Sequence, residues 1–299
     1  MMGNAERDSS ARAREIGEEL RGARVAAKIS AAGLAKAMDC SQTKISRLET
    51  GGRGASELDV TMYLTACGVG RKEILRILDL VRETDDGYRL RPHREQMPDQ
   101  LRSLSAQEAL ASSILVFEPM LVPGILQTED YARQVFRAAG ALAPWDIEAS
   151  VKARLSRQRL LRGGESPYFT FYLHEHALRN MVGNFPVMHE QVMHLLLVSS
   201  YARCEIRVIR RVASPGGVFG GPFWFMRYAE HRPMVYVESH TTSLFLEDKE
   251  DLDKYRQTVG KLGELALDGA QSRRWLATLA SEYDRVKDPR DEHPRSDLA

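Results

Sequence analysis

The stretch DCSQTKISRLETGG, residues 39–52, constrains the fold more tightly than any other part of this 299-residue chain. A helix that begins at Gln42 places Ile45 and Leu48 on one face, which must then point inward. Ser41 stands just before this helix, where its hydroxyl can cap free backbone N–H groups. The other face is polar, and a helix that serves only for packing has no need of such a face.

Short helical segments flank this helix on both sides. From Glu15 to about Thr84, apolar residues recur at intervals of three and four, and Ser30 and Ser56 stand where they can cap further helices. The pattern predicts a compact domain of five short helices, with VTMYLTACGVG and KEILRILDLVRET as the last two. The short segment AAGLAKAM joins the polar helix through a tight turn. This arrangement predicts a helix-turn-helix.

The polar face of the second of these two helices carries side chains suited to DNA. Glutamine and arginine can make paired hydrogen bonds to adenine and guanine, threonine can meet a thymine methyl group, and lysine can meet phosphates. The candidate DNA-contact residues are Gln42, Thr43, Lys44, Ser46, Arg47 and Arg53. The whole chain has a net charge of only +1, so binding must come from this local basic patch. The alternative is a helical bundle whose polar face meets only water.

The stretch LRGARVAAKISAAGLAKAMDCSQTKISRLETG resembles the phage-repressor-type helix-turn-helix of the xenobiotic-response-element family. The matching residues are Leu20, Arg21, Arg24, Leu34, Ala35, Ile45, Ser46, Arg47, Leu48, Glu49 and Gly51. The resemblance implies base contacts by Gln42, Thr43 and Arg47. It also implies that Arg24 pairs with Glu49, which would give this glutamate a structural role.

One position departs from the family pattern. The family often has a glutamine as the first residue of the second helix, where it touches the DNA backbone, and this chain has Ala31. We expect that contact to be lost, or to be supplied by the Ser30 hydroxyl, by the backbone or by Arg53.

The remainder of the chain predicts a second domain, and the overall class is α+β. We expect a disordered N-terminus (1–14), the helix-turn-helix domain (15–84), a polar linker (85–103), a C-terminal domain (104–286) and a charged tail (287–299). We expect a helix in SAQEALASSILVFEP, which Pro119 would end. We also expect Thr128 and Asp146 to cap two further helices. Four segments are predicted to be strands: RCEIRVIRR, PFWFMRY, MVYVES and SLFLE. The short spacing between them favours an antiparallel sheet. Two helices, roughly 249–267 and 270–286, close the domain.

A second resemblance covers this C-terminal domain. It is similar to the C-terminal domain of a large set of actinobacterial regulators, whose signature is V-P-G-hydrophobic-L-Q-T followed by a Tyr-Ala-Arg helix. The matching residues are Val122, Pro123, Gly124, Leu126, Gln127, Thr128, Tyr131, Ala132 and Arg133. The resemblance implies a regulator, antitoxin-like or developmental, that works with a small partner protein encoded nearby. It implies no established chemistry for individual residues.

Few residues suggest catalysis. His174 and His176 would share one face of a strand and could bind a metal ion, but no third ligand stands at a suitable spacing. The glycine-rich stretch GGVFGGP, 216–222, is not followed by a Lys-Ser/Thr helix start and reads as a hairpin turn. We therefore expect no catalytic residue, no metal and no cofactor. An enzyme that carries a DNA-binding module remains the alternative.

Composition places the protein in the cytoplasm, on the nucleoid when bound to DNA. The three cysteines lie far apart without metal-type spacing, and neither a signal peptide nor a segment long enough to cross a bilayer is evident. One recognition helix covers only a few base pairs, so we expect a homodimer on a double-stranded operator. The C-terminal domain is the larger surface, and we assign the dimer contacts and the small partner protein to it.

Overall fold

The computed structural model describes residues 10–52, 55–82, 88–92, 98–140, 143–164, 166–214, 219–239 and 241–285. They fall into two compact units. The first contains the chain up to Ser112 together with Phe225–Tyr255, and the second contains Ser113–Trp224 and the chain from Arg256 onward.

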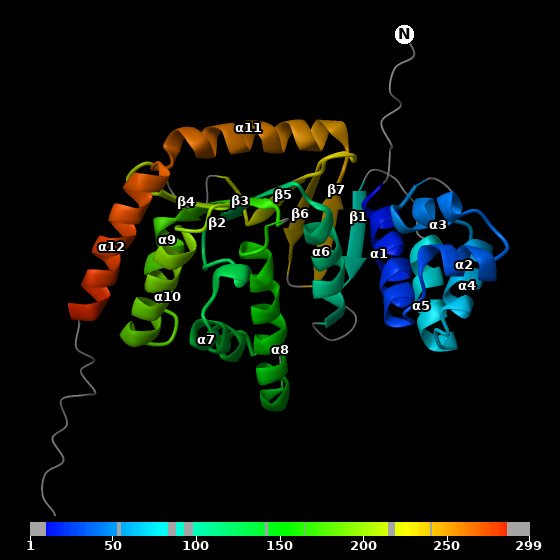
Figure 1. Cartoon of the computed structure of the whole chain (residues 1–299). Helices are drawn as coiled ribbons and strands as arrows, with labels where there is room; N and C mark the ends of the chain where they lie inside the picture. The colour runs from blue at the N-terminus through cyan, green and yellow to red at the C-terminus, as the bar shows by residue number, and fades with distance from the viewer. Residues whose placement is uncertain are drawn as a thin grey trace, which may run out of the picture. The chain divides into compact units, whose positions relative to one another are not determined.

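Five short helices form a bundle at the start of the first unit (Figure 1). They are α1 (Ala11–Ala26), α2 (Ala31–Ala37), α3 (Gln42–Glu49), α4 (Glu57–Ala66) and α5 (Arg71–Arg82). Ser10, Ser30, Ser41 and Ser56 each accept a hydrogen bond from the backbone N–H three residues further on, which caps α1 to α4. The predicted helix-turn-helix bundle is therefore confirmed. The helix α1 begins at Ala11, inside the segment that we expected to be disordered, because Ser10 caps it there.

The joint between α2 and α3 is a tight turn. Asp39 adopts a left-handed conformation with φ 49°, and the Cys40 N–H donates to the Ala35 carbonyl over 2.9 Å. A left-handed residue after the last helical turn, followed by this backward hydrogen bond, is how many helices end. Ser41 then caps α3, so only a few residues separate the two helices.

A close approach of α1 and α3 depends on Gly17. A methyl group built on Gly17 would lie 2.5 Å from the Glu49 carbonyl oxygen and 2.9 Å from its carbonyl carbon. Gly22, on the same helix, would meet nothing within 4 Å. The absence of a side chain at Gly17 therefore lets the end of α3 rest directly on α1.

The first unit also contains strands and one further helix. These are β1 (Tyr88–Pro92), α6 (Pro98–Leu110), most of β5 (Phe223–Arg227), β6 (Met234–Glu238) and β7 (Thr242–Leu246). The pairs β6–β7 and β1–β7 are antiparallel, with Val235 and Tyr88 both opposite Leu246. The segment 85–103, which we expected to be a polar linker, carries β1 and the start of α6. Pairing with β7 accounts for this strand.

A buried polar cluster fixes α1 to the strands of the same unit. The Arg14 side chain is fully buried and forms an ion pair of 2.9 Å with Glu247, directly after β7. Its Nε donates to the Gln107 side chain of α6 over 3.0 Å, and its guanidinium lies 4.3 Å from the centre of the Tyr228 ring. The other Glu247 oxygen accepts the Ala11 N–H at the start of α1. Because a buried charge without a partner is costly, this cluster holds α1 in one position.

The second unit is built on parallel strands. These are β2 (Ser113–Glu118), β3 (Tyr168–His174) and β4 (Cys204–Ile209), with β2–β3 and β3–β4 parallel. Helices α7 (Glu129–Ala139), α8 (Pro144–Ser156), α9 (Glu175–Arg179) and α10 (Phe185–Val198) make the crossovers that parallel strands need. The prediction of an antiparallel sheet therefore holds for β1, β6 and β7 but not for these strands.

Two expectations for local structure in the second unit were wrong. Residues 113–118, predicted as helix, form β2, whose Ile114, Val116 and Phe117 are all buried. A short apolar run of this kind is typical of a parallel strand covered on both faces. In addition, α8 begins at Pro144 after Ala143, so Asp146 lies inside the helix instead of capping it. Two other predictions are confirmed: Thr128 caps α7, and the described chain closes with α11 (Lys249–Leu265) and α12 (Gly269–Arg285). The helices α10 and α12 lie side by side (Figure 1).

The V-P-G-I-L-Q-T stretch forms the centre of a hydrogen-bond network in the second unit. Around the short 3-10 helix η1 (Gly124–Leu126), the Gln127 side chain donates to the Val122 carbonyl over 2.7 Å and accepts from Arg154 over 2.6 Å. Gln158 donates to the Gln127 carbonyl over 2.7 Å. A Cβ at Gly124 would lie 3.3 Å from Arg154 Nε, so the glycine makes room for that side chain. The signature thus has a structural role that links η1 to α8 and to the 3-10 helix η2 (Arg157–Leu161).

We predict opposite effects of alanine at two glycines of α1. In a helix, alanine is normally more stable than glycine by up to about 1 kcal/mol, and Gly22→Ala should show this gain. Gly17→Ala should instead destabilise by about 1–3 kcal/mol, because its methyl group meets backbone atoms that cannot rotate away. Urea unfolding of the full-length variants measures both. Equal stabilisation by the two substitutions would show that α1 and α3 do not approach closely.

Candidate nucleic-acid interface

The helix α3 separates its apolar and polar residues cleanly. Ile45 is fully buried and Leu48 is 5% exposed, both in the core of the five-helix bundle. The candidate DNA-contact side chains that the structure describes are all exposed: Gln42, Thr43, Lys44, Ser46 and Arg47. Arg53, the sixth candidate, lies outside the described residues. The polar face of α3 is therefore open to a ligand along the length of the helix.

Three side chains hold the C-terminal end of α3. Arg24 of α1 makes two hydrogen bonds to the Glu49 carboxylate, Nε to Oε1 over 2.6 Å and Nη2 to Oε2 over 2.8 Å. Tyr63 of α4 is fully buried and donates its hydroxyl to Glu49 Oε1 over 2.5 Å. Arg24 also donates to the Ile29 carbonyl in the joint before α2. A bidentate arginine–carboxylate pair fixes the orientation of the Glu49 side chain as well as its distance from Arg24, so Glu49 cannot point toward DNA.

The electrostatics of this triad favour the ionised glutamate. Burial disfavours the charged carboxylate, but the hydrogen bonds from Arg24 and Tyr63 outweigh burial, and the pKa of Glu49 lies below its usual value. Burial, together with the neighbouring carboxylate, raises the pKa of Tyr63, so its hydroxyl stays protonated as a donor. The triad therefore stabilises the fold over the pH range in which Glu49 is charged.

Lys44, which we expected to meet phosphates, forms an ion pair within the helix bundle. Its ammonium group lies 2.6 Å from Asp59 Oδ1 of α4, in an ion pair whose lysine side chain is 46% exposed and whose aspartate is 18% exposed. The hydrogen bond to Asp59 and its charge raise the pKa of Lys44. Reaching a phosphate thus requires Lys44 to leave Asp59 or to share its protons.

Two basic residues that sequence reasoning left out stand near α2. Lys36 lies on the exposed side of α2, and Lys28, with φ 57°, lies in the joint before it. Ser30 caps α2 by accepting the Gly33 N–H over 3.0 Å, and this bond leaves its hydroxyl proton able to donate to a phosphate. Lysines are among the residues that contact phosphates in protein–DNA complexes, so these two are additional candidates for backbone contacts.

The histidine pair does not form a metal site. His174 ends β3 and is buried, with Nε2 2.9 Å from the Ser214 carbonyl and Nδ1 accepting the His176 N–H over 3.1 Å. His174 thus caps α9, and His176 belongs to that helix instead of sharing a strand face with it. In the described ranges, no group of three or more His, Cys, Asp or Glu side chains is placed to hold a metal ion.

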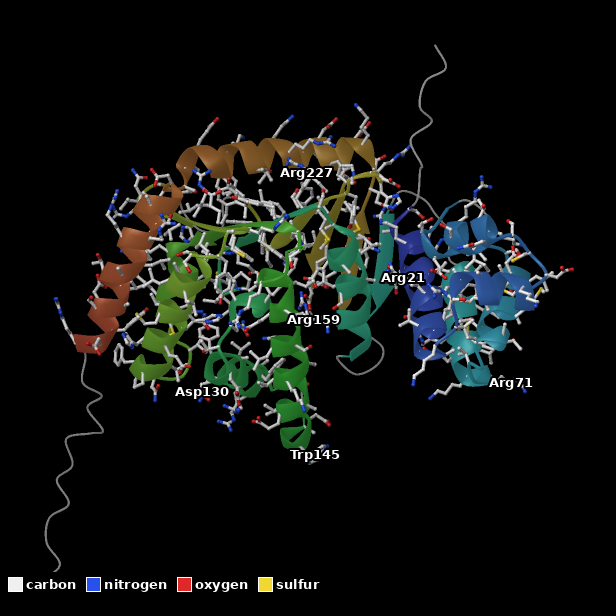
Figure 2. The ribbon with its side chains drawn as sticks, in the orientation of Figure 1. Arg21, Arg71, Asp130, Trp145, Arg159 and Arg227 are labelled. Carbon is white, nitrogen blue, oxygen red and sulfur yellow. The ribbon has the colours of Figure 1, made fainter. Side chains whose placement is uncertain are left out.

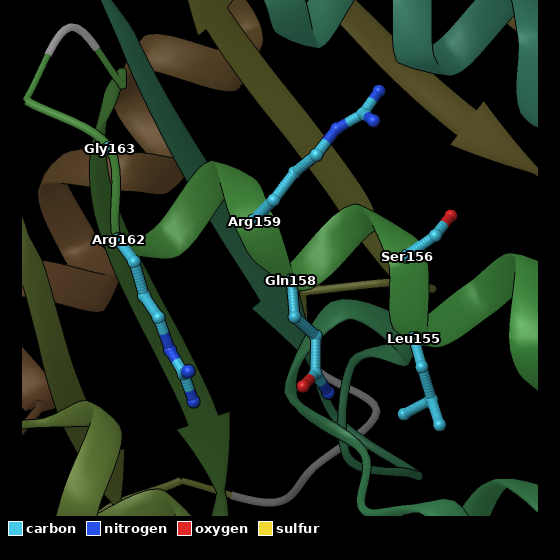
Figure 3. Close-up of a pocket in the computed structure, with 6 residues that line it drawn as sticks. All are labelled: Leu155, Ser156, Gln158, Arg159, Arg162 and Gly163. Carbon is cyan, nitrogen blue, oxygen red and sulfur yellow. The ribbon is translucent and has the colours of Figure 1, made fainter.

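Two further features could form sites. Residues 215–218 lie outside the described residues, and with them the first part of the predicted turn 216–222. An open pocket in the second unit is lined by Leu155, Ser156, Gln158, Arg159, Arg162 and Gly163 (Figure 3). Arg159 points to one side of the chain and Arg162 to the other, so the two guanidinium groups do not converge on one ligand.

Among the helices that the structure describes, none is long and apolar enough to cross a membrane.

We predict that loss of the glutamate in the triad destabilises the protein more than loss of an exposed one. Glu49→Ala leaves Arg24 and Tyr63 without their acceptor and should cost about 3 kcal/mol. The control is Glu57→Ala, which removes an ion pair with Arg82 in which both side chains are about half exposed, so its effect should be much smaller. Thermal unfolding of the full-length variants compares them, and equal melting would contradict a structural role of Glu49.

The same triad gives a pH prediction. Because the pKa of Glu49 is depressed in the folded state, its stabilisation is complete above the unfolded carboxylate pKa of about 4.3 and is lost as the pH falls through the lower, folded value. The difference in stability between wild type and Glu49→Gln should therefore shrink as the pH falls below about 4. A difference that stays constant down to acid unfolding would show that Glu49 is not ionised in the fold.

Comparison with known protein families agrees with this geometry. Residues 15–77 match a helix-turn-helix domain, which supports a DNA-binding regulator. Residues 101–278, more than half of the chain, match a domain of unknown function, DUF5753. A search among curated proteins gave no match. The chain therefore belongs to the DUF5753 family, with a helix-turn-helix domain at its N-terminal end.

Proposed function

We propose that the protein is a sequence-specific, DNA-binding transcriptional regulator of the xenobiotic-response-element type. The observation that carries this proposal is the polar face of α3, which is exposed while the opposite face of the helix is held by Ile45, Leu48 and the Arg24–Glu49 pair. A helix of this size, presented rigidly after a short first helix, fits the major groove with its N-terminal residues at base edges.

The chemistry of each side chain suggests its role. Gln42 and Thr43 stand in the first turn of α3, where we assign them to base edges together with Arg47 one turn later. Among the described residues the Arg47 side chain has no hydrogen-bond partner, so its guanidinium is available to a guanine. Ser46 and Lys44 flank these residues, and we assign them to the DNA backbone, as we do Arg53.

We predict that Arg47→Ala and Gln42→Ala each weaken binding to the preferred sequence by about 1–3 kcal/mol and relax the preference at one base pair. Arg71→Ala is the control, because Arg71 is an exposed arginine at the start of α5, outside the helix-turn-helix pair (Figure 2). Fluorescence anisotropy with single-base variants of the selected sequence measures both effects. If Arg47→Ala lowered affinity equally for preferred and random DNA, Arg47 would not read a base.

We further propose that the C-terminal domain, residues 104–286, forms a homodimer and binds a small partner protein. A two-fold dimer would place two copies of α3 about 34 Å apart, one turn of DNA, or at a multiple of that distance. In support, Trp145 at the start of α8 is 80% exposed (Figure 2). Exposed tryptophans are uncommon on a free surface and frequent at the centre of interfaces.

We predict that Trp145→Ala weakens self-association by about 2 kcal/mol. Its melting temperature should equal that of the wild type at concentrations at which both are monomeric, because the side chain contributes little to its own unit. Val212→Ala is the control, since Val212 is 81% exposed in the same unit and is a small aliphatic residue. Light scattering of the full-length proteins over a range of concentrations, with and without the small protein encoded nearby, measures assembly. A wild-type protein that stays monomeric and ignores this partner would refute the assignment.

A further inference from the structure

The two cationic side chains on the polar face of α3, Lys44 and Arg47, differ in their contacts within the protein. Arg47 makes no side-chain hydrogen bond or ion pair among the described residues, whereas Lys44 is held 2.6 Å from Asp59. Arg47, which is suited to bind a guanine, is thus available, whereas Lys44, which is suited to bind a phosphate, is already paired with Asp59. Sequence spacing alone does not reveal this asymmetry, because Lys44 and Asp59 come from separate helices.

Asp59 is itself fixed in place. Its Oδ2 accepts the Ser56 hydroxyl over 2.8 Å, and its backbone N–H donates to Ser56 Oγ over 3.1 Å, which forms a reciprocal cap at the start of α4. Its other oxygen, Oδ1, faces Lys44. The hydrogen bond from Ser56 favours the orientation in which Asp59 faces Lys44, and it places a negative charge next to the face that we assign to DNA.

The consequence for DNA binding follows from counterion release. A lysine that neutralises a phosphate releases a counterion and strengthens binding to any sequence, and each such contact adds about 0.9 to the slope of log affinity against log salt concentration. A lysine already neutralised by Asp59 contributes little in this way. To reach a phosphate, Lys44 must give up its contact with Asp59, and only a complex held firmly by base contacts keeps the phosphate close enough to offset that loss.

We propose that Asp59 is a positioning residue, which holds Lys44 away from phosphates on random DNA and releases it to the backbone only on the preferred sequence, so that the two complexes differ in salt dependence. This inference rests on the proposed function, that α3 binds DNA. Asp59 positions Lys44 and makes no DNA contact of its own. It lowers affinity for random DNA by withholding a phosphate contact, and it lowers affinity for the preferred sequence by the free energy needed to separate the pair.

The test uses the full-length protein with two DNA duplexes, one of the sequence that it selects from a random pool and one of the same length with that sequence scrambled. Asp59→Asn keeps an oxygen that can accept the Ser56 hydroxyl but removes the charge. We expect it to raise affinity for scrambled DNA by about three- to tenfold and to steepen its salt slope by about one. Affinity for the selected sequence should rise by at least the same factor, because the pair with Asp59 no longer has to be broken, but its salt slope should stay unchanged.

The matched control is Asp59→Asn in a Lys44→Gln background. If Asp59 acts by holding Lys44, removing its charge there should leave the salt slope on scrambled DNA unchanged. The same steepening with and without Lys44 would overturn the proposal, since Asp59 would then act only as a repulsive charge. An unchanged slope in Asp59→Asn alone would overturn it as well.

A variant that does not depend on the stability of Asp59→Asn is Lys44→Gln by itself. We expect it to leave the salt slope on scrambled DNA unchanged and to reduce the slope on the selected sequence by about one. An equal reduction on both duplexes would overturn the proposal. Failure of the wild-type protein to bind either duplex would instead refute the proposed function, and that result differs from every outcome in which binding is present but Asp59 has no effect.

Discussion

The bidentate ion pair between Arg24 and Glu49 is the interaction on which the orientation of α3 depends. It joins the last residue of α3 to α1, and the buried Tyr63 hydroxyl adds a third bond from α4. Ile45 and Leu48 bury one face of α3, but apolar contacts alone do not fix rotation or tilt, since they are non-directional. The hydrogen bonds supply the direction, and Gly17 allows the end of α3 to rest on α1. A polar face built from flexible side chains is thereby carried on a rigid element, as recognition of base edges requires.

The same first helix is held at its other end by a second buried charge. Arg14 lies outside the stretch that matches the helix-turn-helix domain, yet it is fully buried against Glu247, Gln107 and Tyr228. The first unit therefore combines the five-helix bundle with α6 and the strands after residue 225, which belong to the stretch that matches DUF5753. Displacing β7 from α1 would leave the Arg14 charge buried without its partner, which is costly. In the first unit, then, α1 does not swing independently of β7.

Sequence patterns predicted the elements whose folding is local and missed those that depend on distant partners. The serines at positions 30, 41 and 56 cap their own helices, so the bundle and the polar face of α3 were readable from spacing alone. Residues 113–118 were misread as helix because a short apolar run does not reveal whether it extends a helix or crosses a covered sheet. The strand β1 was missed because it pairs with β7, which lies about half of the chain away in sequence. In the candidate interface, exposure of Gln42 and Arg47 could be predicted, but the pairing of Lys44 with Asp59 could not, because it depends on how α4 packs beside α3.

The central claim, that α3 reads a DNA sequence, is tested most directly by sequencing the DNA that is recovered with the full-length protein from cells. A regulator of this kind should enrich one sequence motif, composed of two related half-sites whose centres lie about one helical turn apart or a multiple of it. The same experiment with a variant that lacks the Gln42 and Arg47 side chains should lose the motif and keep only a uniform background. Recovery of DNA with no enriched sequence by the wild-type protein, or of the same motif by the variant, would contradict the claim.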